Sequence, residues 1–345
     1  MANPITGIFL RPLRQRQNAR KLRIDTPNGI QEEQFVSIGG IPQWVTIRSQ
    51  DRANPVLLMV HGGPASPYTP FNSWLGEWEQ YFTVVQWDQR GTGKTFGKNG
   101  EAGTGPLSFQ KLAADGIELV EYLQQHLQAD KVLLLGSSVG SFIGLLMVQQ
   151  RPELFYAYIG TEQNAPDGIE ASYHLTLEAV QRSNNKKAVA ALRAMSADKS
   201  VWNYAQFLAM NKWAIDATPN VPHMVNDLML PALLFAPDYK VRDIKAVHAG
   251  MTYSAAQLFE AMRDFDFDAV GYDFTVPFFV FQGESDIITP VATAQAYVDR
   301  LTAPQKAFVT IPRAGHLAEF CNPQQFLQEL LKYALPCVAP ETKTR

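Results

Sequence analysis

The sequence is poor in the features that mark specialised classes of protein. Cysteine occurs twice in 345 residues, as Cys321 and Cys337, which is too few for a disulfide framework in a chain of this length. A reducing compartment, the cytoplasm, is therefore the expected location. The formal net charge is −3 and charged residues make up 18% of the chain, so no excess of positive charge favours broad binding to nucleic acid.

Long hydrophobic runs are also missing. The longest apolar stretches, such as residues 228–237 (LMLPALLFAP), fall well short of the ~18 residues that a membrane-spanning helix needs. The hydrophobic residues, 46% of the chain, are instead spread along it, which is typical of a globular protein with a large core. The sequence has no visible internal repeat or low-complexity segment.

Acidic residues are absent from the first 24 positions, which hold a cluster of arginines and one lysine. A secretory signal would place its charges before an apolar stretch, whereas here ITGIFL comes first and is too short. We expect residues 1–30 to form a basic arm that packs on the main domain. A transit peptide or a surface-binding arm is the alternative.

Strand-like and helix-like segments alternate in the first half of the chain. Several strand candidates are continuous apolar runs, which suits a sheet that is buried on both faces. Residues 108–128 have helical spacing of apolar positions after a serine cap, and a second helix should follow the turn at 136–140 and end near residue 151. The strand candidates are residues 33–38, 43–48, 55–60, 82–87, 131–135, 155–160, 276–283 and 306–312.

The pattern changes after residue 160. Up to about residue 270 the apolar residues keep helical spacing, and the strand pattern then returns before a last amphipathic helix at 323–335. We therefore expect an α/β domain of residues 31–160 and 270–345, interrupted by a helical insertion at 161–269. In such a parallel sheet the crossovers are right-handed, and ligands bind at the carboxyl ends of the strands.

Residues 88–95 (DQRGTGKT) look like the end of a phosphate-binding loop. Such a loop has the pattern G-x-x-x-x-G-K-[ST], which requires a glycine at position 88. That position is Asp88, whose carboxylate would repel a phosphate. We therefore expect no nucleotide site here.

The segment KVLLLGSSVGSFIGLL (131–146) is an apolar strand, a G-x-S-x-G turn and an apolar helix. This is the context of a nucleophile elbow, in which a sharp turn lifts one serine to the edge of the sheet. The serine at the centre of the motif is Ser138, and we expect it to be the nucleophile.

A serine nucleophile needs a base, and the base needs an acid to orient it. Of six histidines, His316 follows the last strand, on the sheet edge that carries the elbow, so it is the expected base. The acid should precede it in the chain. Asp286, after the strand at 276–283, is the expected acid, with Glu284 and Glu162 as alternatives.

An acyl-transfer site also needs amide donors for the oxyanion that develops. The segment MVHGGPASP (59–67) follows a buried strand, and an HGG loop at this position supplies one such amide. We expect the amides of Gly63 and of Val139, the residue after the nucleophile, to be the donors. His61 is interpreted as a structural hydrogen-bonding residue.

These motifs occur in the order found in α/β-hydrolases similar to proline iminopeptidase, and the chain resembles that family from about residue 30 to 335. The resemblance implies a helical cap between strands six and seven, and it makes residues 88–95 a scaffold turn after strand four. Asp88 and Arg90 would then hold neighbouring loops. The motifs are HGGP (61–64), DQRGTGKT (88–95), GSSVG (136–140), GESD (283–286) and AGH (314–316).

The chain also departs from this family. Iminopeptidases often have Arg-Gly at the end of strand six, which is thought to help recognise a free amine, whereas this chain has Ile159–Gly160. Glu162 follows closely and either contacts the amine of a substrate or caps the loop. The family's HGGPG, GGSWG and final motif serine are replaced by HGGPA, GSSVG and Thr95.

We therefore expect a serine hydrolase that works through an acyl-enzyme on a small-molecule or short-peptide substrate, in the manner of an aminopeptidase. A carboxylesterase on the same triad is the first alternative, and a non-catalytic binding protein of the same fold is the second. The residues suggest no metal or other cofactor, because no cluster of His, Cys and Asp has ligand spacing.

Overall fold

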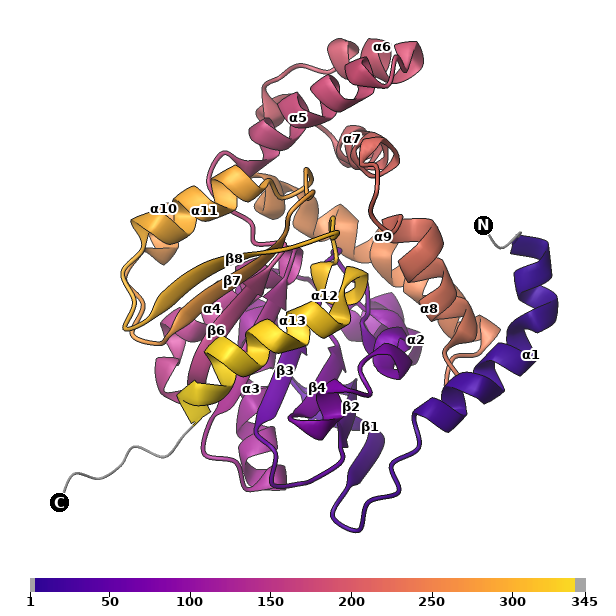
Figure 1. Ribbon diagram of the computed structural model, residues 1–345, viewed down its shortest axis with the longest axis vertical. Helices are drawn as coiled ribbons and strands as arrows, with labels where there is room; N and C mark the ends of the chain where they lie inside the picture. Colours follow the sequence, from indigo (N-terminus) through magenta and orange to yellow (C-terminus); the bar gives the residue numbers. More distant parts are fainter. Residues whose placement is uncertain (1–3, 339–345) are drawn as a thin grey trace.

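The computed structural model describes residues 4–338, and side chains from residue 10 onward. Its centre is an eight-stranded sheet in the order β1-β2-β4-β3-β5-β6-β7-β8 (Figure 1). β2 is antiparallel to β1 and β4, and the other pairs are parallel. The strands are β1 (Ile30–Ile38), β2 (Ile41–Ser49), β3 (Val56–Val60), β4 (Thr83–Asp88), β5 (Val132–Ser137), β6 (Phe155–Thr161), β7 (Phe278–Gly283) and β8 (Lys306–Ile311).

All eight expected strands are present, and the central ones are buried on both faces because their side chains alternate between two apolar cores. In β3, Leu58 and Val60 belong to one core, and Leu57 and Met59 belong to the other. The first core is completed by α3 (Phe109–Leu127), α4 (Val139–Gln150) and α11 (Val291–Arg300). The second is completed by α12 (Ala318–Cys321), α13 (Pro323–Glu329) and the 3₁₀ turns η1 (Thr69–Trp74) and η2 (Trp78–Gln80).

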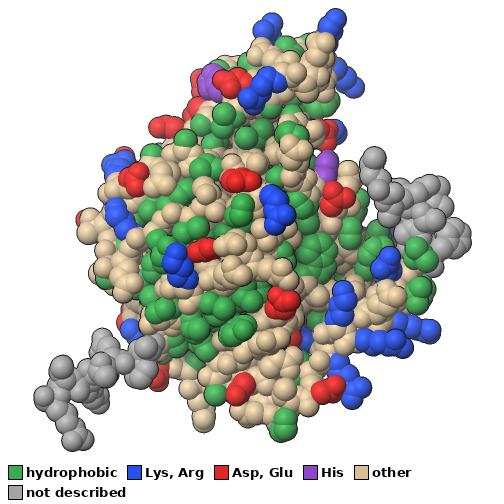
Figure 2. Space-filling view, in the orientation of Figure 1, with side chains coloured by type: hydrophobic (Ala, Val, Ile, Leu, Met, Phe, Trp, Pro, Cys, Tyr) green, Lys and Arg blue, Asp and Glu red, His purple; other side chains and the backbone are tan. Residues whose placement is uncertain are grey.

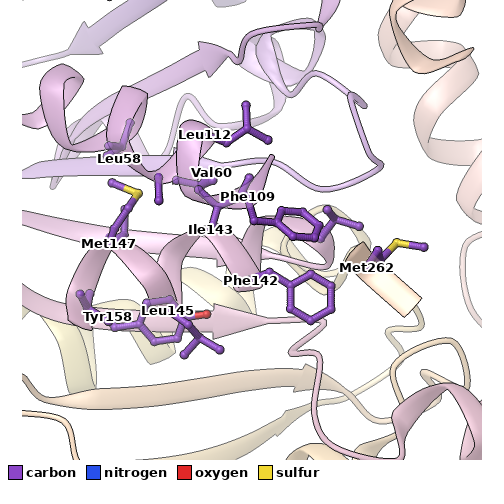
Figure 3. Packing of buried hydrophobic residues seen from close by; sticks show 14 of the residues in the cluster. Leu58, Val60, Phe109, Leu112, Phe142, Ile143, Leu145, Met147, Tyr158 and Met262 are labelled. Carbon is purple, nitrogen blue, oxygen red and sulfur yellow. The ribbon is translucent and has the colours of Figure 1, made fainter. Parts of the chain in front are cut away.

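The first core reaches from the sheet to the helices that follow β6. Figure 3 shows Phe142 of α4 beside Phe109 of α3 and facing Met262, a residue of α9 (Val241–Arg263). The rings of Phe109 and Phe142 are 5.3 Å apart between centroids. This packing fixes α4 between the sheet and α9, so the helix that begins after Ser138 is held from both sides.

Between β6 and β7 the chain forms helices, and the described residues of this stretch contribute no strand to the sheet. The first three of these helices, α5 to α7, stand above the sheet in Figure 1. α8 lies beside α1, and α9 lies beside α2 (Gly93–Thr104). The limits of 161 and 269 for this unit stay a prediction. The helices are α5 (Gly168–Arg182), α6 (Lys186–Ala194), α7 (Tyr204–Ala217), α8 (Leu230–Phe235), α9 and α10 (Phe267–Val270).

The basic segment at the N-terminus contains a helix, α1 (Pro4–Lys21), that packs on α8. Basic side chains are visible along that edge of the molecule (Figure 2). Arg11, Gln15 and Asn18 face the body and donate to backbone carbonyl groups at the end of α8 and just after it. From residue 10 onward, α1 is thus docked through polar side chains.

Candidate active site

Ser138 lies at the sharp turn between β5 and α4. Its φ is 51° and its ψ is −123°, a strained combination for a residue with a side chain. The turn requires a glycine two residues later, because a Cβ on Gly140 would lie 2.1 Å from the carbonyl oxygen of Val60. The sequence motif therefore forms the strand–turn–helix that exposes Ser138 to a cavity.

The structure brings the three expected residues into one chain of hydrogen bonds. His316 Nε2 is 3.1 Å from Ser138 Oγ, and His316 Nδ1 is 2.9 Å from Asp286 Oδ2. If Nδ1 carries the proton and donates it to Asp286, Nε2 is free to accept the proton of Ser138. The two distances thus match the geometry needed to activate the serine.

Asp286 is held rigidly, because its carboxylate accepts several hydrogen bonds. Oδ1 accepts from the amides of Ile288 (2.8 Å) and Thr289 (3.1 Å), and Oδ2 accepts from the Thr289 hydroxyl (2.7 Å). Glu284, the alternative acid, instead accepts from the amide of Arg313 at 2.5 Å. Asp286 is therefore the acid that meets His316.

Burial and charge act in opposite directions on His316. Burial lowers the pKa of its imidazole, while the charge of Asp286 and the hydrogen bond to it raise that pKa, and Glu162 adds to the rise. The net effect is a pKa above the ordinary value of 6.5. The surroundings thus stabilise the imidazolium form that a general base passes through during catalysis.

Gly62, Gly63 and Val139 line the cavity together with Ser138. Val139 is the first residue of α4, so its amide has no acceptor within the helix. Gly62 packs against the elbow so tightly that a Cβ there would lie 2.7 Å from Ser138 Cβ. The loop after β3 thus lies directly on the nucleophile turn, and the expected donors Gly63 and Val139 both line the cavity beside Ser138.

His61 and the segment at 88–95 have structural surroundings. The buried imidazole of His61 lies 2.9 Å from the carbonyl of Gly62, and burial lowers its pKa to about 4. Asp88 accepts from the amide of Lys94 at 2.8 Å, so its carboxylate occupies the place at the start of α2 where a phosphate would lie. Arg90 forms a buried ion pair with Asp115 at 2.7 Å.

Glu162 does not lie in the cavity, where contact with a substrate amine would require it to be. Its side chain is buried, it is not among the residues that line the cavity, and its oxygens accept from Ser137, Thr161 and Ala318. The loop-capping alternative describes this placement. Sequence reasoning missed Glu319, whose carboxyl is also buried near Glu162, because a glutamate in a short helix after His316 carries no recognisable signal.

The cavity above Ser138 has a volume of about 810 Å³ and extends to the helices between β6 and β7. Its lining is mainly apolar and includes four methionines, a flexible residue type that adapts to ligands of different shape. The methionines are Met224, Met229, Met251 and Met262.

Residues 4–338 contain no group of three or more His, Cys, Asp and Glu side chains arranged to hold a metal ion. None of the helices that the structure describes is long and apolar enough to cross a membrane.

A mostly parallel eight-stranded sheet, with a strained serine turn between β5 and α4 and a histidine after β8, defines an α/β hydrolase. A family model described as the alpha/beta hydrolase fold matches residues 55–323. The chain belongs to this family.

Relatives within the family carry different activities in their names. The chain is 27% identical over 304 residues to the probable aminopeptidase YbaC of Bacillus subtilis (strain 168), covering 87% of this chain and 95% of the relative. Its fold is similar to that of the proline iminopeptidase of Mycobacterium smegmatis (TM-score 0.60, 18% identity, 89% and 99% coverage). It is also similar to that of an esterase from Thermogutta terrifontis (TM-score 0.57, 18% identity, 90% and 100% coverage).

Proposed function

We propose that this protein is a serine hydrolase that forms an acyl-enzyme on Ser138 and, like an aminopeptidase, cleaves the amide bond after the first residue of a small substrate. The observation that carries the hydrolase proposal is the hydrogen-bond chain Ser138–His316–Asp286, with distances of 3.1 and 2.9 Å. The amide bond is proposed because the relative from Bacillus subtilis is named a probable aminopeptidase.

In the proposed reaction His316 Nε2 takes the proton of Ser138 as Oγ attacks the carbonyl carbon of the substrate. The amides of Gly63 and Val139 donate to the resulting oxyanion. His316 then gives the proton to the leaving amine. A water molecule, deprotonated by the same imidazole, attacks the acyl carbon, and His316 returns that proton to Ser138 Oγ as the ester bond breaks.

An aminopeptidase needs an anionic partner for the free amine of its substrate. Three of the four aspartates that line the cavity are already engaged: Asp216 pairs with Lys212, Asp268 pairs with Arg300, and Asp266 accepts from the amide of Ala269. The carboxylate of the fourth, Asp167, has no hydrogen-bond partner among the described residues, and it does not cap α5. We infer that Asp167 is the candidate partner for the amine.

A fluorophosphonate probe tests the hydrolase proposal. Folded wild-type protein should be labelled covalently, and Ser138→Ala should not be. Ser137→Ala should still be labelled, only more slowly, because Ser137 is not in the cavity lining but its hydroxyl bonds to Glu162 beside the elbow. Intact-mass measurement reports the adduct. Wild-type protein that stays unlabelled would leave the non-catalytic binding protein as the better description.

A carboxylesterase is the second candidate function, favoured by the mainly apolar lining of the cavity. The two candidates separate on a panel of prolyl and other aminoacyl arylamides and of short p-nitrophenyl esters. Under the peptidase proposal, Asp167→Asn raises KM for arylamides with a free amine and leaves KM for esters unchanged. Ester hydrolysis without arylamide turnover would remove the peptidase proposal and retain the esterase.

A further inference from the structure

Two buried carboxyl groups lie beside the triad and take no part in the proposed reaction. Glu162 follows β6 and Glu319 lies in α12, and both side chains have no exposed surface. Neither residue lines the cavity. Two buried acids in such a place require a physical explanation, because an unpaired buried charge is strongly unfavourable.

Glu162 ties the segment that carries the nucleophile to the segment that carries the base. One carboxylate oxygen accepts from the hydroxyl of Ser137, the residue before the nucleophile, at 2.6 Å. The other accepts from the Thr161 hydroxyl at 2.8 Å and from the amide of Ala318, two residues after His316, at 2.7 Å. A single side chain thus links the end of β5, the end of β6 and the loop of His316.

The hydrogen bonds indicate which of the two acids carries the charge. Two close buried carboxyls cannot both be ionised at moderate cost, so the pair keeps one proton. Glu162 has three donors, which stabilise an ionised carboxylate, whereas both oxygens of Glu319 lack a hydrogen-bond partner among the described residues. Burial raises the pKa of both carboxyl groups above their ordinary values, so the three donors to Glu162, and not burial, decide where the proton lies. The proton therefore belongs on Glu319.

We propose that Glu162 is a positioning residue for the hydrolysis proposed above: its carboxylate holds Ser138 and His316 at reacting distance and stabilises the protonated form of His316, while Glu319 stays neutral. This inference rests on the proposed function for its catalytic consequence. Its electrostatic part concerns His316 alone and can be measured without a substrate.

Other titratable groups surround Glu162 and must be kept constant in any test. They come from η1 and its flanking loop, from the segment after β7 and from the His316 loop with α12. Asp286 contributes the largest stabilising charge to His316, and Glu162 adds to it. The groups are Tyr68, Asp286, His316, Glu319 and Cys321.

The test compares Glu162→Gln with Glu319→Gln. Glu162→Gln removes the negative charge that favours the imidazolium, so the acid limb of kcat/KM should move to lower pH, and kcat should fall about 10- to 100-fold with little change in KM. Glu319→Gln replaces a neutral acid with a neutral amide and should leave the acid limb in place. If Glu162 has a purely structural role, Glu162→Gln should lower kcat without moving the acid limb. If the acid limb moves in Glu319→Gln alone, the ionised acid is Glu319 and not Glu162. Either result would overturn the proposal.

Two further measurements test the proposal when no substrate is turned over or when Glu162→Gln does not fold. The imidazole titration of His316, followed by NMR and assigned with His316→Asn, should shift to lower pH in Glu162→Gln even if no substrate is turned over. The titration therefore tests the charge of Glu162 separately from the proposed hydrolase activity. If Glu162→Gln does not fold, Ser137→Ala is the second variant, because it removes one of the three donors to Glu162 and leaves both acids unchanged in the sequence. It should also lower kcat, but by a smaller factor than Glu162→Gln. An unchanged kcat there would contradict the positioning role.

Discussion

Single residues at the elbow have almost no freedom to change. Ser138 adopts a left-handed φ of 51°, which a residue with a side chain adopts only when its neighbours impose it. Gly140 and Gly62 impose it here, because the chain passes too close at both positions for a Cβ. The sequence motif therefore reports a steric requirement as well as a chemical one.

Gly62→Ala should damage catalysis more than stability. The new Cβ would lie 2.7 Å from Ser138 Cβ and 2.8 Å from the Ser137 carbonyl oxygen, so the loop or the elbow must move, and with it the oxyanion donors. We expect kcat to fall by about 100-fold, the scale of losing one donor. Gly76→Ala is the control, because nothing lies within 4 Å of a Cβ there. Steady-state kinetics on both variants tests this prediction. Equal kcat in Gly62→Ala and Gly76→Ala would contradict it.

The pH dependence of activity should report the raised pKa of His316. The base must be neutral, so kcat/KM should fall as the pH drops through a midpoint above the ordinary value of 6.5. Asp286→Asn removes the charge that raises this pKa, so the acid limb should move to lower pH and kcat should fall about 10⁴-fold. A pH–rate profile of both proteins checks this, and an unmoved limb would contradict the role of Asp286.

His61 should make folding sensitive to acid. Burial lowers its pKa to about 4, whereas an unfolded histidine titrates near 6.5. The associated stability is complete above pH 6.5 and is lost as the pH falls through about 4, with a total of about 3 kcal/mol. Urea unfolding at pH 7 and pH 5 measures the slope. His61→Asn should be less stable at pH 7 and should depend less on pH, and a slope equal to that of the wild type would contradict the assignment.

At the scale of elements, periodicity in the sequence predicted the strands and the long helices, because burial on one face repeats with the period of the backbone. The final helix at 323–335 is less regular than expected, since α13 ends at Glu329 and a π-helical turn follows at Leu330–Ala334. The periodicity of apolar residues could not predict which face of α1 packs on the body of the protein. From residue 10 onward the half-buried positions of α1 are Arg11, Gln15 and Asn18, all of which are polar.

The polar face of α1 supports α8 and the residues that follow it. Arg11 donates to the carbonyl of Tyr239 and Gln15 to that of Ala236, each at 2.7 Å, just after α8. The double variant Arg11→Ala/Gln15→Ala should lose about 2 kcal/mol of stability, at about 1 kcal/mol per hydrogen-bonding group. Arg16→Ala/Arg20→Ala on the exposed face is the control. Equal denaturation midpoints for the two double variants would show that α1 does not brace α8.

At the scale of the whole molecule, the sheet carries the candidate catalytic residues, and the helices between β6 and β7 form most of the cavity wall above them. Ser138, Asp286 and His316 follow three different strands, and the parallel order of β5 to β8 brings them to one edge. The cavity walls come instead from α4, α5, α7, α9 and η5 (Met224–Met229). Reactivity and selectivity are therefore expected to change independently.

Met229→Trp should separate these two properties. Met229 lines the cavity, so a larger side chain should reduce turnover of substrates with a bulky acyl group and spare the shortest ones. Its neighbour Leu230 is exposed and is absent from the lining, so Leu230→Trp is a matched control. A series of p-nitrophenyl esters of increasing length gives the readout. Parallel loss on all esters in Met229→Trp would mean that the elbow itself was disturbed.

The sequence by itself determined the strands, the long helices and the elbow, because strand and helix periods, tight turns and glycine requirements act over a few neighbouring residues. The tertiary structure alone decided which of three acids meets His316, which face of α1 is buried, and that Glu162 lies beside Glu319 rather than in the cavity. These outcomes depend on residues far apart in the chain. Burial and the approach of distant charges, which set the pKa and the pairing of each group, exist only after the chain has folded.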